Sequence, residues 1–205
     1  MGEMIWNPIV EVEGAHGTRT MSLRAKHLAN RCIFLSGRID AEMADAFLSQ
    51  FLYLEQESSE PVTIYINSPG GEVNAGLLIY DTVQGSVLEV NMICAGMAAS
   101  MAAVILAGGQ PGHRFMLPHS KVMIHEPLIE GGVGGSATSI KNISESILET
   151  RKIINGILAK HTGKTVEEID AATSFDNIMN ALEAQEFGIC DDITKKIRVE
   201  MKVRE

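Results

Sequence analysis

Short apolar runs of strand length recur along the chain, and most are followed by a turn and then by a helix-like segment. The runs are Cys32–Leu35, Val62–Ile66, Val90–Ala95 and Val122–Ile124. Continuous apolar runs bounded by turn residues are typical of buried strands. Alternation of such strands with short helices favours an α/β fold with a largely parallel sheet.

Local chemistry predicts where several helices begin and end. Asp40 can cap a helix in which Met43, Phe47, Leu48, Phe51 and Leu54 share one face. A long amphipathic helix is expected from about residue 137 to 161, and Gly163 is expected to end it. Two further helices have capping boxes, formed by Thr165 with Glu168 and by Asn180 with Glu183, the second closed by Gly188.

The remaining segments have weaker patterns. We expect residues 1–22 to form an irregular N-terminal arm and residues 23–205 a single domain, with Gly96 opening a turn. The glycine-dense stretch 131–135 predicts a mobile excursion, and the tail from Lys195 a last strand or a frayed end.

Composition excludes several classes of protein. The 205-residue chain carries a net charge of −9, which disfavours nucleic acid and anionic membrane surfaces as partners. Its three cysteines have no CxxC spacing, so we expect reduced thiols and no metal site. Neither a membrane-length apolar run nor a secretory leader pattern stands out, so a cytoplasmic location is expected.

Ser100 is the first candidate for a catalytic nucleophile. It follows Gly96–Ala99 between a predicted strand and an Ala-rich predicted helix. A serine at a strand-to-helix turn is exposed and rigid, as a nucleophile must be. The same position is also typical of a helix N-cap, so residue type leaves both interpretations open.

A serine nucleophile needs a base and a carboxylate that orients it. Among six histidines, His125 is distinctive because it ends an apolar strand, although a structural role is equally compatible with that position. Downstream carboxylates are Asp170, Asp176, Asp191 and Asp192, and Asp176 lies in a turn-like break. Gly70–Gly71 offers unhindered backbone N–H groups for an oxyanion, or forms a simple turn.

Several long motifs resemble the Clp protease proteolytic subunit. They are INSPGG at 66–71, Ala75-Gly76, IYDT at 79–82, GMAASMA at 96–102, Leu117-Pro118 and VMIHEP at 122–127. The resemblance extends from about residue 30 to 193. It implies the Clp protease/crotonase-like α/β fold of repeated β-β-α units, with a long handle at about 126–162.

The resemblance also implies roles for individual residues. It identifies Ser100 as nucleophile, His125 as base and Asp176 as the third triad member, with Gly71 and Met101 as backbone oxyanion donors. Substrate is expected to bind as an added strand along Gly70–Val73 and Leu128.

The family assembles as two stacked seven-membered rings, a tetradecamer, that receive unfolded polypeptides from an ATP-driven AAA+ unfoldase. The peptidase itself uses no metal, ATP or other cofactor. The unfoldase-docking pocket is expected at Tyr65, Ile93, Phe115 and Leu117.

The sequence departs from the family pattern in places. Phe175 replaces an arginine that pairs across the rings, and Ala102 replaces a glycine. Thr63 and Gly85 stand where large apolar side chains are usual. The 10–24 arm resembles the family's axial loop only loosely, and the handle tip is slightly longer. Two alternative functions therefore remain compatible with the sequence: a catalytically weak or regulatory subunit of a mixed ring, and a specialised processing peptidase.

A crotonase-like acyl-CoA enzyme using Glu72 and Glu126 is the other alternative, although it would leave the Ser/His/Asp set unexplained.

Overall fold

A computed structural model describes residues 7–14, 17–129, 132 and 134–197. Its main sheet runs in the order β3-β4-β5-β6-β9, with β7 paired to β5 and β8 paired to β7. The strands are β3 (Cys32–Ser36), β4 (Val62–Ser68), β5 (Val90–Ala99), β6 (Arg114–Met116), β7 (Lys121–Ile124), β8 (Asn177–Asn180) and β9 (Asp192–Ile193). Among these described strands only the β7–β8 pair is antiparallel, which confirms the α/β prediction.

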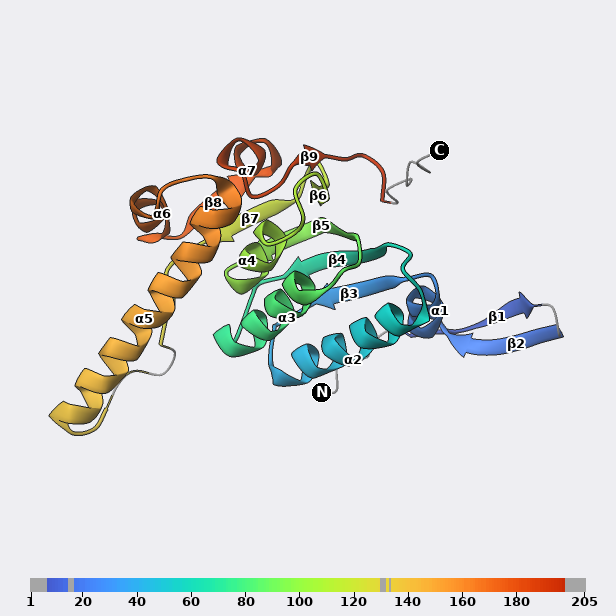
Figure 1. The fold of residues 1–205 in the computed structure, drawn as a ribbon, viewed down its shortest axis with the longest axis horizontal. Helices are drawn as coiled ribbons and strands as arrows, with labels where there is room; N and C mark the ends of the chain where they lie inside the picture. Colours follow the sequence, from blue (N-terminus) through green and yellow to red (C-terminus); the bar gives the residue numbers. More distant parts are fainter. Residues whose placement is uncertain (1–6, 15–16, 130–131, 133, 198–205) are drawn as a thin grey trace.

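Helices cover one face of the sheet and one of its ends (Figure 1). The covering layer is α2 (Ala41–Glu57), α3 (Val73–Gly85) and α4 (Met101–Ala107). Every residue of α4 is buried, so this helix lies in the centre of the core. The short helix α1 (Leu23–Ala29) precedes β3, while α5 (Ala137–Thr162), α6 (Val166–Thr173) and α7 (Ala181–Phe187) surround the β7–β8 end.

Strand β5 is longer than the sequence predicted. The expected turn at Gly96 is wrong, because the strand continues to Ala99 and changes partner along its length. Its first half pairs with β6 and its second half with β7. Gly96 has φ +116° where the partner changes, and its N–H donates to Ser120 Oγ at 2.9 Å. The glycine therefore redirects the strand toward the site instead of ending it.

Short strands missing from the prediction complete the fold. The arm is not irregular: β1 (Ile9–Gly14) and β2 (Gly17–Ser22) form an antiparallel hairpin. Strands β6, β8 and β9 were not expected, and β8 separates two helices that the sequence placed next to each other. Gly131, Val133 and the last eight residues of the expected tail lie outside the described residues.

The predicted caps are confirmed. Asp40, Thr165 and Asn180 accept N-cap hydrogen bonds, and both capping boxes are complete. Gly163 and Gly188 adopt the left-handed conformation that ends α5 and α7. The apolar stripe of α5 is buried only in its second half, at Ile154 and Leu158. The first half projects from the body of the protein (Figure 1).

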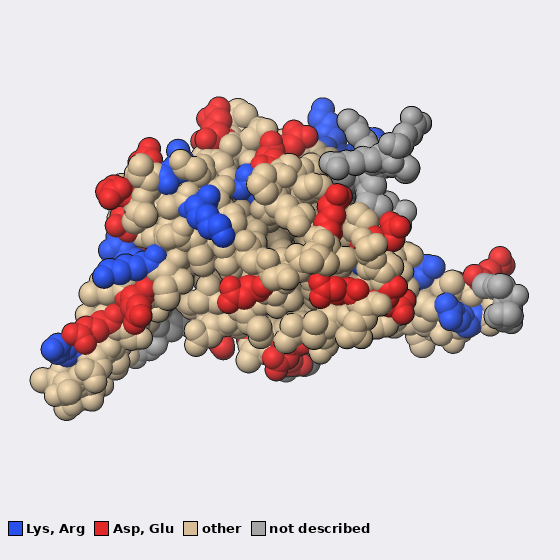
Figure 2. Space-filling view, viewed as in Figure 1, with Lys and Arg blue, Asp and Glu red and all other residues tan. Residues whose placement is uncertain are grey.

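The view in Figure 2 shows acidic side chains along the face formed by α2 and α3, with basic side chains near α5. In the part of the chain that the structure describes, no helix is both long and apolar enough to cross a bilayer. The same residues contain no His/Cys/Asp/Glu cluster with the geometry of a metal site.

Candidate active site

Parallel pairing of β5 and β7 brings Ser100 and His125 together. Ala99 lies opposite Met123 in the register, and the two candidate residues follow these strands directly. The N–H of Ser100 donates to the carbonyl of Met123 at 2.8 Å, which fixes the two strand ends relative to each other. Both side chains thus stand at the carboxyl ends of adjacent parallel strands, a usual place for functional groups in α/β sheets.

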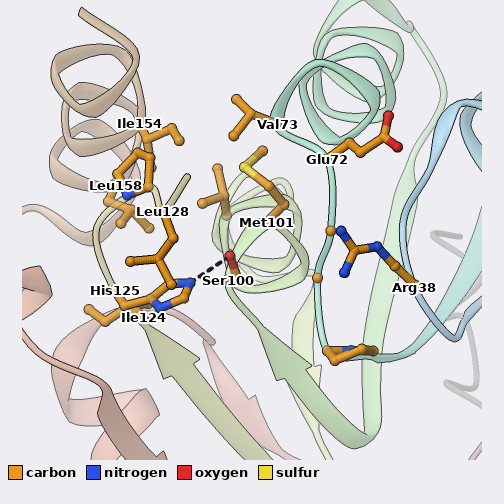
Figure 3. Close-up of a pocket in the computed structure, with 15 residues that line it drawn as sticks. Arg38, Glu72, Val73, Ser100, Met101, Ile124, His125, Leu128, Ile154 and Leu158 are labelled. Carbon is orange, nitrogen blue, oxygen red and sulfur yellow. Dashed lines mark hydrogen bonds between the residues drawn. The ribbon is translucent and has the colours of Figure 1, made fainter. Parts of the chain in front are cut away.

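Three side chains form a continuous hydrogen-bonded relay. His125 Nε2 lies 2.9 Å from Ser100 Oγ, the contact drawn as a dashed line in Figure 3. His125 Nδ1 lies 3.1 Å from Asp176 Oδ1. Asp176 is held there because β8, which starts at the next residue, pairs with β7, placing Asn177 opposite Ile124. Of the four carboxylates considered from sequence, the structure brings only Asp176 to His125 Nδ1.

The backbone of Ser100 has a conformation that non-glycine residues rarely adopt. Its φ of +53° and ψ of −123° set a sharp corner between β5 and α4. Ser100 does occupy the N-cap position of α4, but its side chain makes no capping hydrogen bond. Strained corners of this kind persist where the surrounding packing imposes them, and they raise the serine hydroxyl above the strand end.

Gly70 lies directly against this corner, and Gly71 lies against Ile39. The N–H of Ile39 donates to the carbonyl of Gly70, and the N–H of Glu72 donates to the carbonyl of Ile39, both at 2.8 Å. In a parallel bridge the middle residue turns its own N–H and C=O to the opposite side, so those of Gly71 face away from Ile39. This leaves one backbone edge of the segment available on the side of the cavity.

A cavity of about 360 Å³ opens at the relay. The Gly70–Gly71 segment, Arg38, Glu72, Ser100 and His125 form its polar boundary. Figure 3 shows Leu128, Ile154 and Leu158 on the left, Met101 and Val73 in the centre above Ser100, and Arg38 and Glu72 on the right. The cavity can therefore hold an apolar side chain next to the Ser100 hydroxyl, with extended backbone alongside.

The expected docking residues lie on the sheet face away from α2–α4. Tyr65, Ile93 and Leu117 line a second cavity of about 430 Å³, together with Phe34 and Ile197. The rings of Phe34 and Tyr65 stack with centroids 5.1 Å apart. Phe115 lies next to Ile93 in the β5–β6 register, but it does not line this cavity.

Sequence reasoning missed a buried ion pair that ties the helices behind the site. Arg114, 7% exposed, donates to Asp191 and also to the carbonyls of Ala107, His161 and Gly188. These carbonyls lie at the ends of α4, α5 and α7, respectively. Hydrogen bonds from Arg114 hold the pKa of Asp191 below its usual value, although burial opposes the shift. No local sequence pattern predicts the Arg114–Asp191 pair, because 77 residues separate the two side chains.

Most of the chain matches a known protein family. The family model described as Clp protease matches residues 15–197. The chain belongs to the Clp protease family. This confirms the resemblance seen in the motifs, and it makes the protein a Clp-type peptidase, a serine hydrolase. Three of the motifs contribute residues to the first cavity, whereas Leu117 lines the second: the motif residues of the first are Pro69, Gly70, Gly71, Ser100, Met101, Ile124, His125 and Pro127.

Proposed function

We propose that the protein is the proteolytic subunit of an ATP-dependent Clp protease, a serine endopeptidase that hydrolyses peptide bonds of unfolded polypeptides. The single observation that carries the proposal is the hydrogen-bonded relay from Ser100 through His125 to Asp176. A serine hydroxyl is a weak nucleophile until a base accepts its proton, and an imidazole at 2.9 Å meets that requirement.

In the proposed reaction Asp176 accepts a hydrogen bond from His125 Nδ1–H, which leaves Nε2 as the proton acceptor. His125 takes the proton of Ser100 as Oγ attacks the peptide carbonyl, and it then delivers that proton to the leaving amine. An acyl-enzyme on Ser100 remains. Water attacks it with His125 again as the base, which releases the carboxylate product and restores the serine.

The backbone N–H groups of Gly71 and Met101 are the proposed oxyanion donors. A Cβ added to Gly70 would lie 2.7 Å from Ser100 Cβ and 3.1 Å from the amide nitrogen of Met101, so the glycine segment lies directly beside the nucleophile. The N–H of Gly71 faces away from Ile39. Two donors near the nucleophile stabilise charge that develops on the carbonyl oxygen, with little reorganisation.

We propose that substrate adds a strand between the Gly70–Val73 segment and the segment at Leu128. The unused edge of Gly71 offers main-chain hydrogen bonds, which explains how unrelated sequences would be accepted. The apolar wall at Met101, Ile154 and Leu158 favours an apolar P1 side chain. The Leu128 side chain is 69% exposed, so bound peptide would cover it.

We further propose assembly into stacked seven-membered rings with an AAA+ unfoldase docked at the second cavity. Its aromatic and aliphatic lining suits apolar side chains of a partner loop. The projecting half of α5 carries exposed Ile140 and Ile143, at 45% and 37%, which supports contact with another copy. Phe175, 60% exposed beside Asp176, would make the ring contact apolar where the family has an ion pair.

The test is hydrolysis of a fluorogenic peptide with an apolar P1 residue. Ser100→Ala should reduce kcat by at least about 10³-fold without changing the particle size measured by light scattering. Ser49→Ala, an exposed serine on α2, is the control and should match wild type. Equal activity in Ser100→Ala would refute the proposal, whereas an intact particle without activity in wild type would favour a regulatory subunit.

A further inference from the structure

Arg151 on α5 lies between two carboxylates that belong to separate segments of the site. Its Nε is 3.4 Å from Glu126 Oε2, and its Nη2 is 3.6 Å from Asp170 Oδ1. Glu126 follows His125 in the chain, and Asp170 lies on α6, six residues before Asp176. One guanidinium therefore pairs with the segment of the base and with the segment that leads to its carboxylate partner.

Further contacts connect the same three segments. The N–H of Glu126 donates to the carbonyl of Thr173 at 2.8 Å, three residues before Asp176. Asn155, one turn after Arg151 on α5, is fully buried and donates from Nδ2 to Asp170 Oδ1. The His125 and Asp176 segments thus meet through this backbone hydrogen bond in addition to the β7–β8 ladder and the His125–Asp176 contact, and both meet α5 through charged or polar side chains.

We propose that Arg151 is a positioning residue of the peptidase, which holds the Asp176 segment in register with His125. The inference rests on the proposed function, since it concerns the geometry of the same triad. Arg151 Nε is buried without a hydrogen-bond partner, so its hold on Glu126 is electrostatic and depends on its charge. Glu126 and Asp170 are 44% and 49% exposed, so they stay hydrated when Arg151 is replaced, and the fold survives.

The pH dependence of covalent labelling at Ser100 distinguishes positioning from a direct charge effect. The charged groups around the base are Asp176 before β8, Glu126 on its own segment, Arg151 on α5 and Asp170 on α6. Loss of a nearby positive charge by itself raises the pKa of a histidine. Loosening the hydrogen bond to Asp176 lowers that pKa, because the carboxylate stabilises the protonated ring. The two mechanisms shift the acid limb of the rate profile in opposite directions.

The experiment measures the rate of fluorophosphonate labelling of the full-length protein from about pH 5 to about pH 9, the range in which histidine titrates. Arg151→Met should label about three- to tenfold more slowly at the plateau, with its acid limb shifted to lower pH. Arg151→Lys should recover part of the rate, because it keeps the charge. Lys152→Met removes a neighbouring exposed cation from the same helix and should match wild type.

An unchanged profile, or an acid limb shifted to higher pH, in Arg151→Met would overturn the inference while leaving the proposed function intact. If that variant fails to fold, Arg151→Gln removes the same positive charge while keeping a polar side chain and should shift the limb to lower pH, and no shift or a shift to higher pH would count equally against the inference. Failure of wild type to label would overturn the triad assignment and the positioning role together.

Discussion

Gly70→Ala tests whether the glycine segment next to Ser100 serves catalysis. Gly70 has φ +87°, and an added Cβ would lie 2.6 Å from the Ala99 carbonyl oxygen and 2.7 Å from Ser100 Cβ. Those neighbours are a backbone atom and the Cβ of Ser100, so no flexible side chain can turn away. The segment must therefore shift away from the corner at Ser100.

Displacement of the Gly70–Gly71 segment should lower the free energy of unfolding and should lower kcat more strongly. Placing a non-glycine residue at this φ costs about 1–3 kcal/mol. Displacing Gly71 would remove one of the two proposed oxyanion donors, and loss of such a donor lowers kcat by about 10²–10³-fold. The hydrogen bonds of Ser100 and His125 involve neither glycine, so the proposed nucleophile and base should remain in place.

The assay compares peptide hydrolysis and thermal unfolding of Gly70→Ala with those of Gly156→Ala. Gly156 lies inside α5, and a Cβ there would meet nothing within 4 Å. This control should unfold at a higher temperature, stabilised by about 0.5–1 kcal/mol, with unchanged activity. If Gly70→Ala folds and retains more than about a tenth of wild-type kcat, the oxyanion assignment at Gly71 is wrong.

Three further changes probe the relay and the framework behind it. Asp176→Asn should lower kcat at neutral pH by about 10⁴-fold in the peptide assay, and a loss below tenfold would contradict its role. Arg114→Met leaves Asp191 without its cation and should destabilise the protein by about 3–5 kcal/mol in urea unfolding, whereas a change below about 1 kcal/mol would show that the pair contributes little. Burial lowers the pKa of His161 below its usual value, so the unfolded chain takes up a proton first as the pH falls. The midpoint temperature of thermal unfolding should therefore fall as the pH is lowered below about 6.5, and His161→Asn should weaken this pH dependence. An equal slope of midpoint temperature against pH in both proteins would refute the role given to His161.

Local chemistry explains which parts of the fold were predictable. The capping boxes at Thr165 and Asn180 depend on side chains three residues away, so the sequence contains both partners. The continuation of β5 past Gly96 depends on β7, which lies more than twenty residues further along the chain. Strands β6, β8 and β9 are too short to show a period, and only their partners define them.

The hairpin β1–β2 was missed for a different reason. Val10 and Val12 alternate with Glu11 and Glu13, which is a strand pattern, but none of these four residues is buried and no apolar run marks them. An alternation this short was interpreted as irregular chain.

The candidate site was predictable only through the motifs. Ser100 and His125 are 25 residues apart, and His125 and Asp176 are 51 apart, so no spacing rule connects them. Residue types alone left an N-cap serine and a turn aspartate equally acceptable. The ion pairs of Arg114 and Arg151 were missed because the sequence does not show which carboxylates lie near an arginine. Without that information both residues resemble ordinary surface cations.

The most direct test of the central claim is the intact mass of the purified protein after treatment with a fluorophosphonate, with Ser100→Ala treated alongside. The proposed triad predicts a single adduct on wild type, located at Ser100 by peptide mapping, and no adduct on the variant. An adduct on Ser100→Ala, or one located at another residue of wild type, would contradict the assignment of Ser100 as the activated nucleophile.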